Sequence, residues 1–314
     1  MGFEAERVRR VTCPRCEREV DVSLAKPLST IVCPVCRAGV PVPVRFGSIL
    51  VTHKLGKGSG ARVYAAFDRV LGRNVAIKLL RAADKQSKGI QDGLTEARRL
   101  MEVRHPHVVE IYAIQSWQHQ PVIIMELLEG GALRDLIARN GCVPESRAIR
   151  IALEAAFGLR ETHRRGMLHL DVKPGNLMFT AAGATKVLDF GLGVIAEQDR
   201  AEEIVGSPLY VAPELVRRRP PTAQADIYSL GVTLYYALCG EPPFRGRSLD
   251  ETLKLRLRQP PPDVQCVNPC VSEPTARLVL RMMATEPHDR VQSYDDLIDE
   301  LRRLERGLEH AAVA

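Results

Sequence analysis

The order of secondary-structure patterns along this chain is the feature that most constrains its fold. From residue 48 onward, short segments rich in Val, Ile and Tyr predict strands. The predicted strands cover residues 49–56, 61–70, 75–80, 109–117 and 121–128, with one helix at about 90–103. Further along, amphipathic periodicity predicts helices over residues 144–165, 223–240, 272–284 and 293–309. A strand-rich part followed by a helix-rich part predicts an α+β fold with two lobes.

Four of the eight cysteines lie near the start of the chain, in the sequences CPRC and CPVC. Cys13, Cys16, Cys33 and Cys36 have the spacing C-x2-C-x16-C-x2-C, which is typical of a four-Cys zinc site. Each C-P-x-C turn can offer two thiolates, so two turns complete a tetrahedron around one metal ion. A redox-active pair of dithiols is the alternative. The pattern resembles a zinc ribbon, and we expect bound Zn2+ to supply its folding free energy because large apolar side chains are few.

Residues 39–47, GVPVPVRFG, predict a stiff Pro-rich linker or an edge strand after this ribbon. The chain has no run of about 18 apolar residues and no signal-peptide core at its start, so we expect a cytoplasmic protein without a membrane partner. The net charge of +6 is spread along the chain, which weakly favours acidic partners without indicating nucleic acid.

Two motifs in the strand-rich part suggest phosphate binding. The stretch LGKGSGARVY lies between the first two predicted strands, and its glycines would let backbone N–H groups approach phosphate oxygens. A plain β-turn would also explain these glycines. The stretch VAIK places Lys78 at the end of an apolar strand, where its charge needs a partner. Glu96 on the predicted helix is the candidate, although a surface lysine and an ordinary helical glutamate remain the alternative.

The helix-rich part contains HLDVKPGN at residues 169–176 and DFG at residues 189–191. Pro174 and Gly175 exclude a helix from the first motif. Asn176 and Asp189 offer the oxygen ligands that Mg2+ prefers. Asp171 can accept a hydroxyl proton, and Lys173 can neutralise charge on a phosphoryl group. Positioning and electrostatics of this kind are what phosphoryl transfer requires.

Taken together, GKGSGARV, VAIK, HLDVKPGN, DFG and APE resemble in order and spacing the eukaryotic-like (Hanks-type) serine/threonine protein kinases. The resemblance extends from residue 48 to about residue 308. It implies a bilobal protein kinase fold over residues 46–310, with an N-lobe at about 46–128 and a C-lobe at about 129–310, after a zinc ribbon and linker at 1–45. It also implies ATP and Mg2+ as cofactors, and transfer of the γ-phosphoryl group to Ser/Thr hydroxyls of protein substrates.

The resemblance assigns a role to each motif residue. The catalytic residues would be Asp171, as the base, with Lys173, Lys78 and Glu96. The nucleotide-binding residues would be Gly56, Lys57, Gly58, Ser59, Gly60, Val63, Ala76, Lys78, Met125, Glu126, Leu128 and Met178, with Asn176 and Asp189 acting through Mg2+. The structural residues would be a stack of Leu100, Ile111, His169 and Phe190, a Glu214–Arg290 ion pair, and Asp226 as the anchor of the catalytic loop. Ala61 departs from the pattern, because relatives have their third glycine at that position.

Leu170 is a second departure, since most relatives have Arg there. An arginine at this position pairs with a phosphate on the activation segment and orders it. Residues 189–206 contain no Ser, Thr or Tyr, so both halves of that switch are missing. We therefore expect activity without activation-segment phosphorylation, with control from the ribbon or from self-association. In the alternative, Arg200 pairs with a phosphate on Ser207.

Two other functions compete with an active kinase. A pseudokinase would bind nucleotide or act as a scaffold without transfer, but it would not need Lys78, Glu96, Asp171, Asn176 and Asp189 together. A nucleic-acid-binding ribbon would use the basic residues near Arg15, but acidic residues interleave with them and aromatic platforms are nearly absent. We therefore expect protein substrates and a ribbon that serves in docking, regulation or self-association.

Overall fold

The computed structural model describes residues 5–57, 61–80, 88–117, 120–190 and 207–313. The predicted loop residues Gly58, Ser59 and Gly60 lie outside these ranges, as do residues 191–206 with Arg200, and the side chains of Lys57 and Glu96 are not described either. The chain forms two compact units, Met1–Met101 with Glu110–Leu127 and Glu102–Val109 with Leu128–Ala314. Among the described residues, no helix is long and apolar enough to cross a bilayer.

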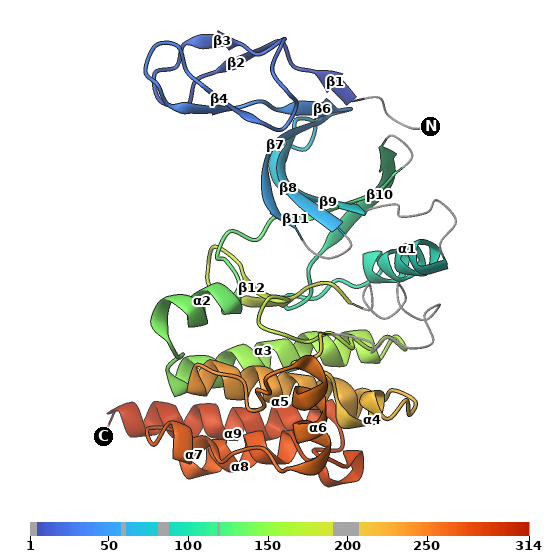
Figure 1. The fold of residues 1–314 in the computed structure, drawn as a ribbon, viewed down its shortest axis with the longest axis vertical. Coiled ribbons are helices and arrows are strands. Elements are labelled where there is room, and N and C mark those ends of the chain that lie inside the picture. The colour runs from blue at the N-terminus through green and yellow to red at the C-terminus, as the bar shows by residue number, and fades with distance from the viewer. Residues whose placement is uncertain (1–4, 58–60, 81–87, 118–119, 191–206, 314) are drawn as a thin grey trace. The chain divides into compact units, whose positions relative to one another are not determined.

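The first unit is built around a curved antiparallel sheet of seven strands, in the order β1-β6-β7-β8-β9-β11-β10 (Figure 1). These strands are β1 Ala5–Arg7, β6 Val44–Phe46, β7 Ile49–Lys57, β8 Ala61–Asp68, β9 Arg73–Leu80, β10 Ile111–Trp117 and β11 Gln120–Glu126. Helix α1, Lys88–Met101, precedes β10 in the chain. The carboxylate of Asp68 accepts the N–H groups of Val70 and Leu71, and this local bonding closes the turn between β8 and β9. The five strands and the helix that the sequence predicts here are present with shifts of one or two residues at most ends.

Two small hairpins carry the cysteine motifs. They are β2 Arg10–Thr12 with β3 Glu19–Asp21, and β4 Thr30–Val32 with β5 Gly39–Pro41. Their shared core consists of buried valines and cysteines, namely Cys13, Val20, Val22, Cys33, Val40 and Val42. Such a small core agrees with the expectation that this segment needs a metal ion to fold.

Residues 39–47, expected to be a linker or an edge strand, form two short strands: β5 in a two-stranded hairpin, and β6, which is an internal strand of the large sheet. Strand β6 pairs with β1 on one side and with β7 on the other. Pro41 and Pro43 both precede β6, so every N–H group of the strand is available for pairing. Phe46 on β6 is buried in the main core of the sheet, and Leu28 from the cysteine-bearing segment packs against the same core. The division of the chain at residue 45 stays a prediction, and β6 spans that position.

The second unit is helical apart from one short hairpin. Its elements are α2 Leu133–Asn140, α3 Glu145–His163, β12 Leu177–Phe179, β13 Thr185–Val187, α4 Pro213–Val216, α5 Ala223–Cys239, α6 Leu249–Arg258, α7 Val264–Val267, α8 Glu273–Met282, the 3-10 helix η1 Pro287–Asp289 and α9 Tyr294–Val313. Helix α5 is apolar on nearly all sides and almost entirely buried, as expected of a central helix. It packs against α3 and α8, and α3 packs against α9 (Figure 1).

An ion pair between Glu214 on α4 and Arg290 after η1 lies inside this helical unit. The guanidinium donates two parallel hydrogen bonds to the carboxylate, at 2.8 and 2.7 Å, and both side chains are fully buried. Arg290 also donates to the carbonyl oxygens of Ala284 and Gln224. The ion pair expected from the sequence is therefore present, and backbone carbonyl oxygens accept the remaining N–H groups of Arg290.

We predict that Arg290→Met destabilises the chain strongly, because it leaves the Glu214 carboxylate buried without a counter-charge. A loss of about 3–5 kcal/mol is expected for a broken buried pair. Urea unfolding measures it, with Arg277→Met on the exposed face of α8 as the matched control. Equal unfolding midpoints for the two variants would contradict the prediction.

Candidate functional site

The four N-terminal cysteines converge on one point. The sulfur atoms of Cys13, Cys16, Cys33 and Cys36 all lie within 4.8 Å of one another. The Sγ atoms of Cys13 and Cys36 are 3.5 Å apart, and those of Cys16 and Cys33 are 3.7 Å apart. Zn–S bonds of about 2.3 Å in a tetrahedron would separate the sulfurs by about 3.8 Å. The donor set and its spacing therefore fit a closed four-thiolate zinc site better than disulfides, whose sulfurs would be bonded.

Each cysteine turn has the same backbone geometry. The N–H groups of Glu17 and Arg37 donate to the carbonyl oxygens of Cys13 and Cys33, and both residues have a φ of about +60°. The backbone N–H groups of Arg15 and Cys16 approach the Cys13 sulfur and lower the pKa of its thiol to about 6. Backbone N–H groups of Cys36 and Val35 likewise lower the pKa of Cys33. At Cys16 the backbone N–H of Arg18 acts in the same direction, but burial and the neighbouring cysteines outweigh it and raise the pKa to about 12. Because the thiolate is the form that binds metal, the turns favour the ligating form at Cys13 and Cys33.

A second site lies in the helical unit, on the loop that precedes β12. The buried carboxylate of Asp226 on α5 accepts the backbone N–H groups of His169, at 2.8 Å, and Leu170, at 2.7 Å. The hydroxyl of Tyr294 on α9 donates to the same carboxylate at 3.2 Å. Burial raises the pKa of Asp226, and the contacts from His169, Leu170 and Tyr294 oppose that rise. Asp226 therefore anchors the loop, as the sequence predicts.

Three polar side chains of this loop point toward one another. The ammonium of Lys173 donates to Asp171 Oδ2 at 2.6 Å, and the amide nitrogen of Asn176 donates to the same oxygen at 3.1 Å. Lys173 also donates to the hydroxyl of Ser207 at 2.6 Å, while the Ser207 N–H donates to Asp171 Oδ1 at 3.0 Å. A carboxylate, an ammonium and a hydroxyl thus share one set of hydrogen bonds.

The loop is linked to the DFG motif through His169. The Asp171 N–H donates to His169 Nδ1, so the ring proton lies on Nε2, which donates to the Leu188 carbonyl at 2.7 Å. The rings of His169 and Phe190 pack with their centroids 4.6 Å apart. Asp189, which lies between Leu188 and Phe190 in the chain, has a φ of +60°, a conformation that is uncommon for residues other than glycine. These contacts fix Asp189 relative to Asp171 and Asn176.

The predicted nucleotide-binding residues of the first unit lie on neighbouring strands. Val63 on β8 faces Lys78 on β9 across the ladder, and Ala76 on β9 faces Met125 on β11. Lys78 and Met125 are both buried. Two further residues of the set lie at strand positions, since Gly56 pairs with Val63 and Glu126 is the last residue of β11. Leu128, Met178, Asn176 and Asp189 belong to the second unit, so the predicted nucleotide site and the stack of Leu100 and Ile111 with His169 and Phe190 stay predictions.

Arg256 on α6 is a residue that the sequence did not single out. Its side chain is 1% exposed, and its guanidinium donates to the carbonyl oxygens of Pro208, Leu209 and Val211 at 2.6–2.8 Å. It therefore holds the segment that follows Ser207. An arginine near the end of an amphipathic helix usually lies on the solvent face, and no sequence signal distinguishes this one.

We predict that the purified chain binds zinc through the four cysteines. Cys13→Ser should remove the metal, because three thiolates and a weak ligand do not close the tetrahedron. Elemental analysis measures zinc per chain, and Co2+ substitution gives thiolate-to-metal absorption bands. Cys142→Ser, at an exposed cysteine outside the cluster, is the matched control and should keep its zinc. Zinc-free wild-type protein would contradict the assignment.

Comparison with known proteins identifies the family. The protein kinase domain family matches residues 49–300. The chain is 34% identical over 262 residues to serine/threonine-protein kinase PknB of Mycobacterium leprae, covering 81% of this chain and 42% of the relative. It is 34% identical over 246 residues to the DNA damage-responsive serine/threonine-protein kinase RqkA of Deinococcus radiodurans, covering 76% of this chain and 37% of the relative. The chain thus spans about two fifths of the length of these curated relatives.

The fold agrees with this assignment. A crystal structure of Rad53 1-466 in complex with AMP-PNP aligns with a TM-score of 0.68 at 24% identity, covering 79% of this chain and 63% of that chain. This likeness confirms the predicted protein kinase fold. The family match includes the VAIK, HLDVKPGN, DFG and APE motifs on which the predicted resemblance rests. The chain therefore belongs to the protein kinase family, as a relative of bacterial serine/threonine kinases.

Proposed function

We propose that this chain is an active kinase that transfers the γ-phosphoryl group of ATP to Ser or Thr hydroxyls of proteins in the presence of Mg2+. The observation that carries the proposal is the hydrogen-bonded set of Asp171, Lys173, Asn176 and Ser207. It brings the hydroxyl of Ser207 against a proton acceptor and a cation on a loop that a buried carboxylate anchors. A scaffold would not need this combination.

In this proposal each loop residue has a separate task. Asp171 orients the acceptor hydroxyl and takes its proton, while Lys173 neutralises charge on the phosphoryl group. Asn176 uses its amide nitrogen for Asp171, so its amide oxygen is the atom suited to Mg2+, together with the carboxylate of Asp189. The bound Mg2+ supplies charge neutralisation at the phosphates. Ser207 occupies the hydroxyl position beside Asp171 and Lys173, which supports Ser/Thr as the acceptor class.

The strand residues of the first unit supply the nucleotide contacts in this proposal. Lys78 holds the phosphates and pairs with Glu96, and Val63, Ala76 and Met125 contact the adenine base. The opposition of Val63 to Lys78 and of Ala76 to Met125 on adjacent strands supports a shared binding surface. Leu128 and Met178 are two further residues to which the family resemblance assigns contact with the base.

The zinc ribbon acts in this proposal as a docking or regulatory module. Leu24, Val32 and Val35 are large apolar side chains that are more than half exposed on this small segment. Apolar side chains exposed on one small module favour contact with a protein or with a second copy of the chain. Acidic residues interleaved with the basic ones, such as Glu19 with Arg10, argue against nucleic acid.

The test is incorporation of labelled phosphate into a generic protein substrate. The wild-type chain should label Ser and Thr with ATP and Mg2+, and Asp171→Asn should not. Phosphoamino-acid analysis reports the acceptor class. Nucleotide binding without any transfer by the wild-type chain would favour the pseudokinase alternative instead.

We predict that Lys78→Met lowers phosphoryl transfer by at least about a hundredfold, because preorganised charge at the phosphates is lost. The fold should persist, since Met fills a similar volume on the buried strand β9. Steady-state kinetics and thermal unfolding measure the two effects. Lys54→Met on the exposed side of β7 is the matched control. Full activity of Lys78→Met would show that the role of Lys78 is misassigned.

We predict that the kinase does not require phosphorylation of its activation segment. Leu170 is buried with a φ of +58°, and its N–H group is held by Asp226, so the position offers no cation for a phosphate. Phosphatase-treated protein should keep its initial rate on an exogenous peptide. A large drop in rate that phosphorylation of Ser207 restores would refute the prediction and favour the pairing with Arg200.

A further inference from the structure

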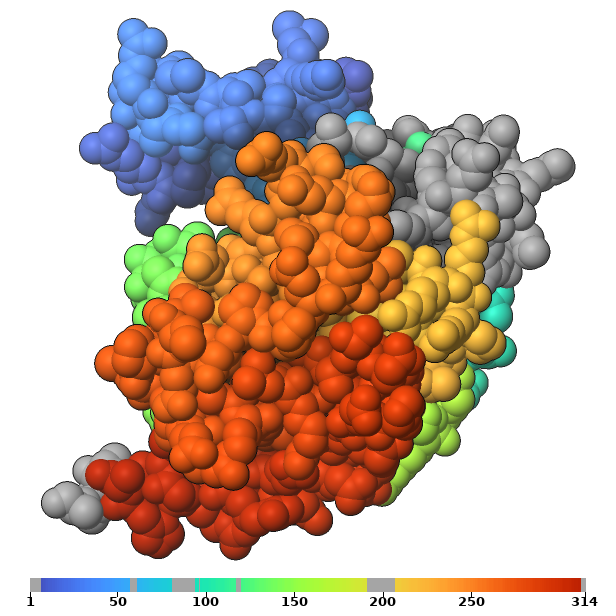
Figure 2. Space-filling view, turned by 60° about the horizontal axis from the view of Figure 1, so that its bottom comes forward, coloured from blue at the N-terminus to red at the C-terminus, as the bar shows by residue number. Residues whose placement is uncertain are grey.

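A basic pocket of about 540 Å³ lies in the helical unit, beside the loop of Asp171. Three arginines line it, Arg134, Arg245 and Arg247, and none of the described residues in its lining is acidic. Leu209 and Leu249 form apolar parts of the lining and are 37% and 53% exposed. The segment around residue 250, orange in Figure 2, is exposed on the surface of this unit. The pocket therefore presents positive charge and apolar surface together to the solvent.

Two backbone hydrogen bonds tie this pocket to the catalytic loop. The N–H group of Tyr210, in the lining, donates to the carbonyl of Ser207 at 2.8 Å, and Ser207 in turn contacts Asp171 and Lys173. The N–H group of Arg134 donates to the carbonyl of Pro174 at 3.0 Å, within the catalytic loop itself. A peptide whose hydroxyl reaches Asp171 would therefore have neighbouring residues within reach of this pocket.

Arg256 holds part of the lining of the pocket in place. Its three hydrogen bonds to the carbonyls of residues 208, 209 and 211 hold Leu209 and Tyr210 in place. The rings of Tyr228 and Phe244 lie 5.9 and 5.8 Å from its guanidinium carbon. Its described hydrogen bonds are to carbonyl oxygens and to the side chain of Tyr228, with no carboxylate among these partners, so a buried positive charge lies behind the pocket in addition to the three arginines. This charge disfavours a basic ligand and favours an acidic one.

The acidic side chains near the pocket have partners of their own. The Glu251 carboxylate accepts the backbone N–H of Arg247, and Asp250 pairs with Lys254. Arg134 meets Asp135 only at 3.4 Å, in a pair whose side chains are both more than half exposed, and such exposed pairs contribute little. Among the described residues, the side chains of the three arginines therefore keep most of their capacity to bind an acidic group on another molecule.

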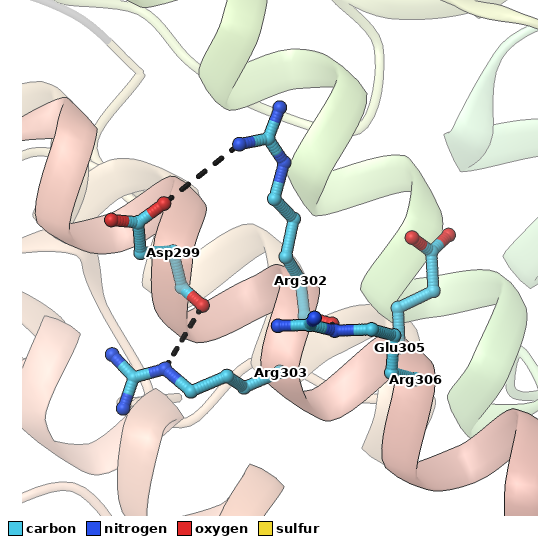
Figure 3. Close-up of a pocket in the computed structure, with 5 residues that line it drawn as sticks. All are labelled: Asp299, Arg302, Arg303, Glu305 and Arg306. Atoms are coloured by element: carbon cyan, nitrogen blue, oxygen red, sulfur yellow. Dashed lines mark hydrogen bonds and ion pairs between the residues drawn. The ribbon is translucent and has the colours of Figure 1, made fainter.

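A second hollow, on α9, does not share these properties. It is lined by Asp299, Arg302, Arg303, Glu305 and Arg306, all from one helix (Figure 3). Arg302 pairs with the Asp299 carboxylate, and Arg303 donates to the Asp299 carbonyl. Arg302 and Arg303 are thus engaged within the helix, and among the described residues none that lines this hollow bonds to the loop of Asp171.

We propose that the basic pocket binds the segment of the protein substrate next to the acceptor Ser or Thr, and that it selects an acidic side chain with an apolar neighbour. This inference rests on the proposed kinase function. Arg245 and Arg247 are the specificity-determining residues, because both are exposed and neither is needed to hold the loop. Arg256 is a positioning residue that acts through the carbonyls of the loop after Ser207.

The test compares synthetic peptides that share one Ser acceptor and differ only in Glu, Gln or Lys at each flanking position. The wild-type chain should have a lower KM for a Glu peptide than for its Lys counterpart. The double variant Arg245→Glu/Arg247→Glu should raise the KM for the Glu peptide about tenfold and lower that for the Lys peptide, with kcat nearly unchanged. Arg277→Glu, on the exposed face of α8, is the matched control and should change neither.

A binding measurement separates this inference from the proposed activity. Fluorescence anisotropy follows a labelled Glu peptide, with Ala in place of its acceptor Ser, on the intact chain. Tighter binding of the Glu peptide than of the Lys peptide, lost in the double variant, supports the pocket whether or not transfer occurs. Absence of transfer to every peptide would refute the kinase function alone. Equal binding or equal KM for Glu and Lys peptides, or a preference that survives in the double variant, would overturn the inference.

Discussion

The helical unit depends on the buried carboxylate of Asp226. Two consecutive backbone N–H groups, those of His169 and Leu170, need an acceptor because the chain turns there with a positive φ at Leu170. Asp226 supplies both oxygens from the first turn of α5, the most buried helix of the unit. A side chain on a rigid helix thereby sets the geometry of a loop that has no regular structure. The side chains of Asp171, Lys173 and Asn176 can converge because Asp226 holds the backbone at the start of their loop in place.

The elements that have a long local sequence pattern could be predicted from the sequence. The long helices and the sheet strands appear within a few residues of their predicted ends, because their periodicity extends over many residues. The Glu214–Arg290 pair and the anchor at Asp226 were expected from the family resemblance, and the structure contains both. The short elements α2, α4, α7, β12 and β13 were missed, because segments of three to eight residues carry too little pattern to detect. The ten-residue helix α6 was missed as well.

Features set by tertiary contact could not be predicted. Strand β6 has the composition of a linker, and only its pairing with both β1 and β7 makes it an internal strand. Arg256 has the sequence environment of an exposed helical arginine, yet it is buried against three carbonyls. The arginines of the basic pocket lie far apart in the sequence, at α2 and before α6, so no motif contains them. In each case the deciding partner is remote along the chain.

The position of β6 has a consequence for the solubility of the kinase fold. A β7 strand of nine residues would present a long row of unpaired backbone groups if it were the edge of the sheet. In this chain β6 pairs with the first three residues of β7, Ile49–Val51, and β1 pairs with β6 in turn, so the outermost strand is only three residues long. These two strands, which flank the cysteine-bearing segment, thus protect that end of β7 against edge-to-edge pairing. Shortening the chain to begin at β7 would uncover this edge together with the core around Ile49.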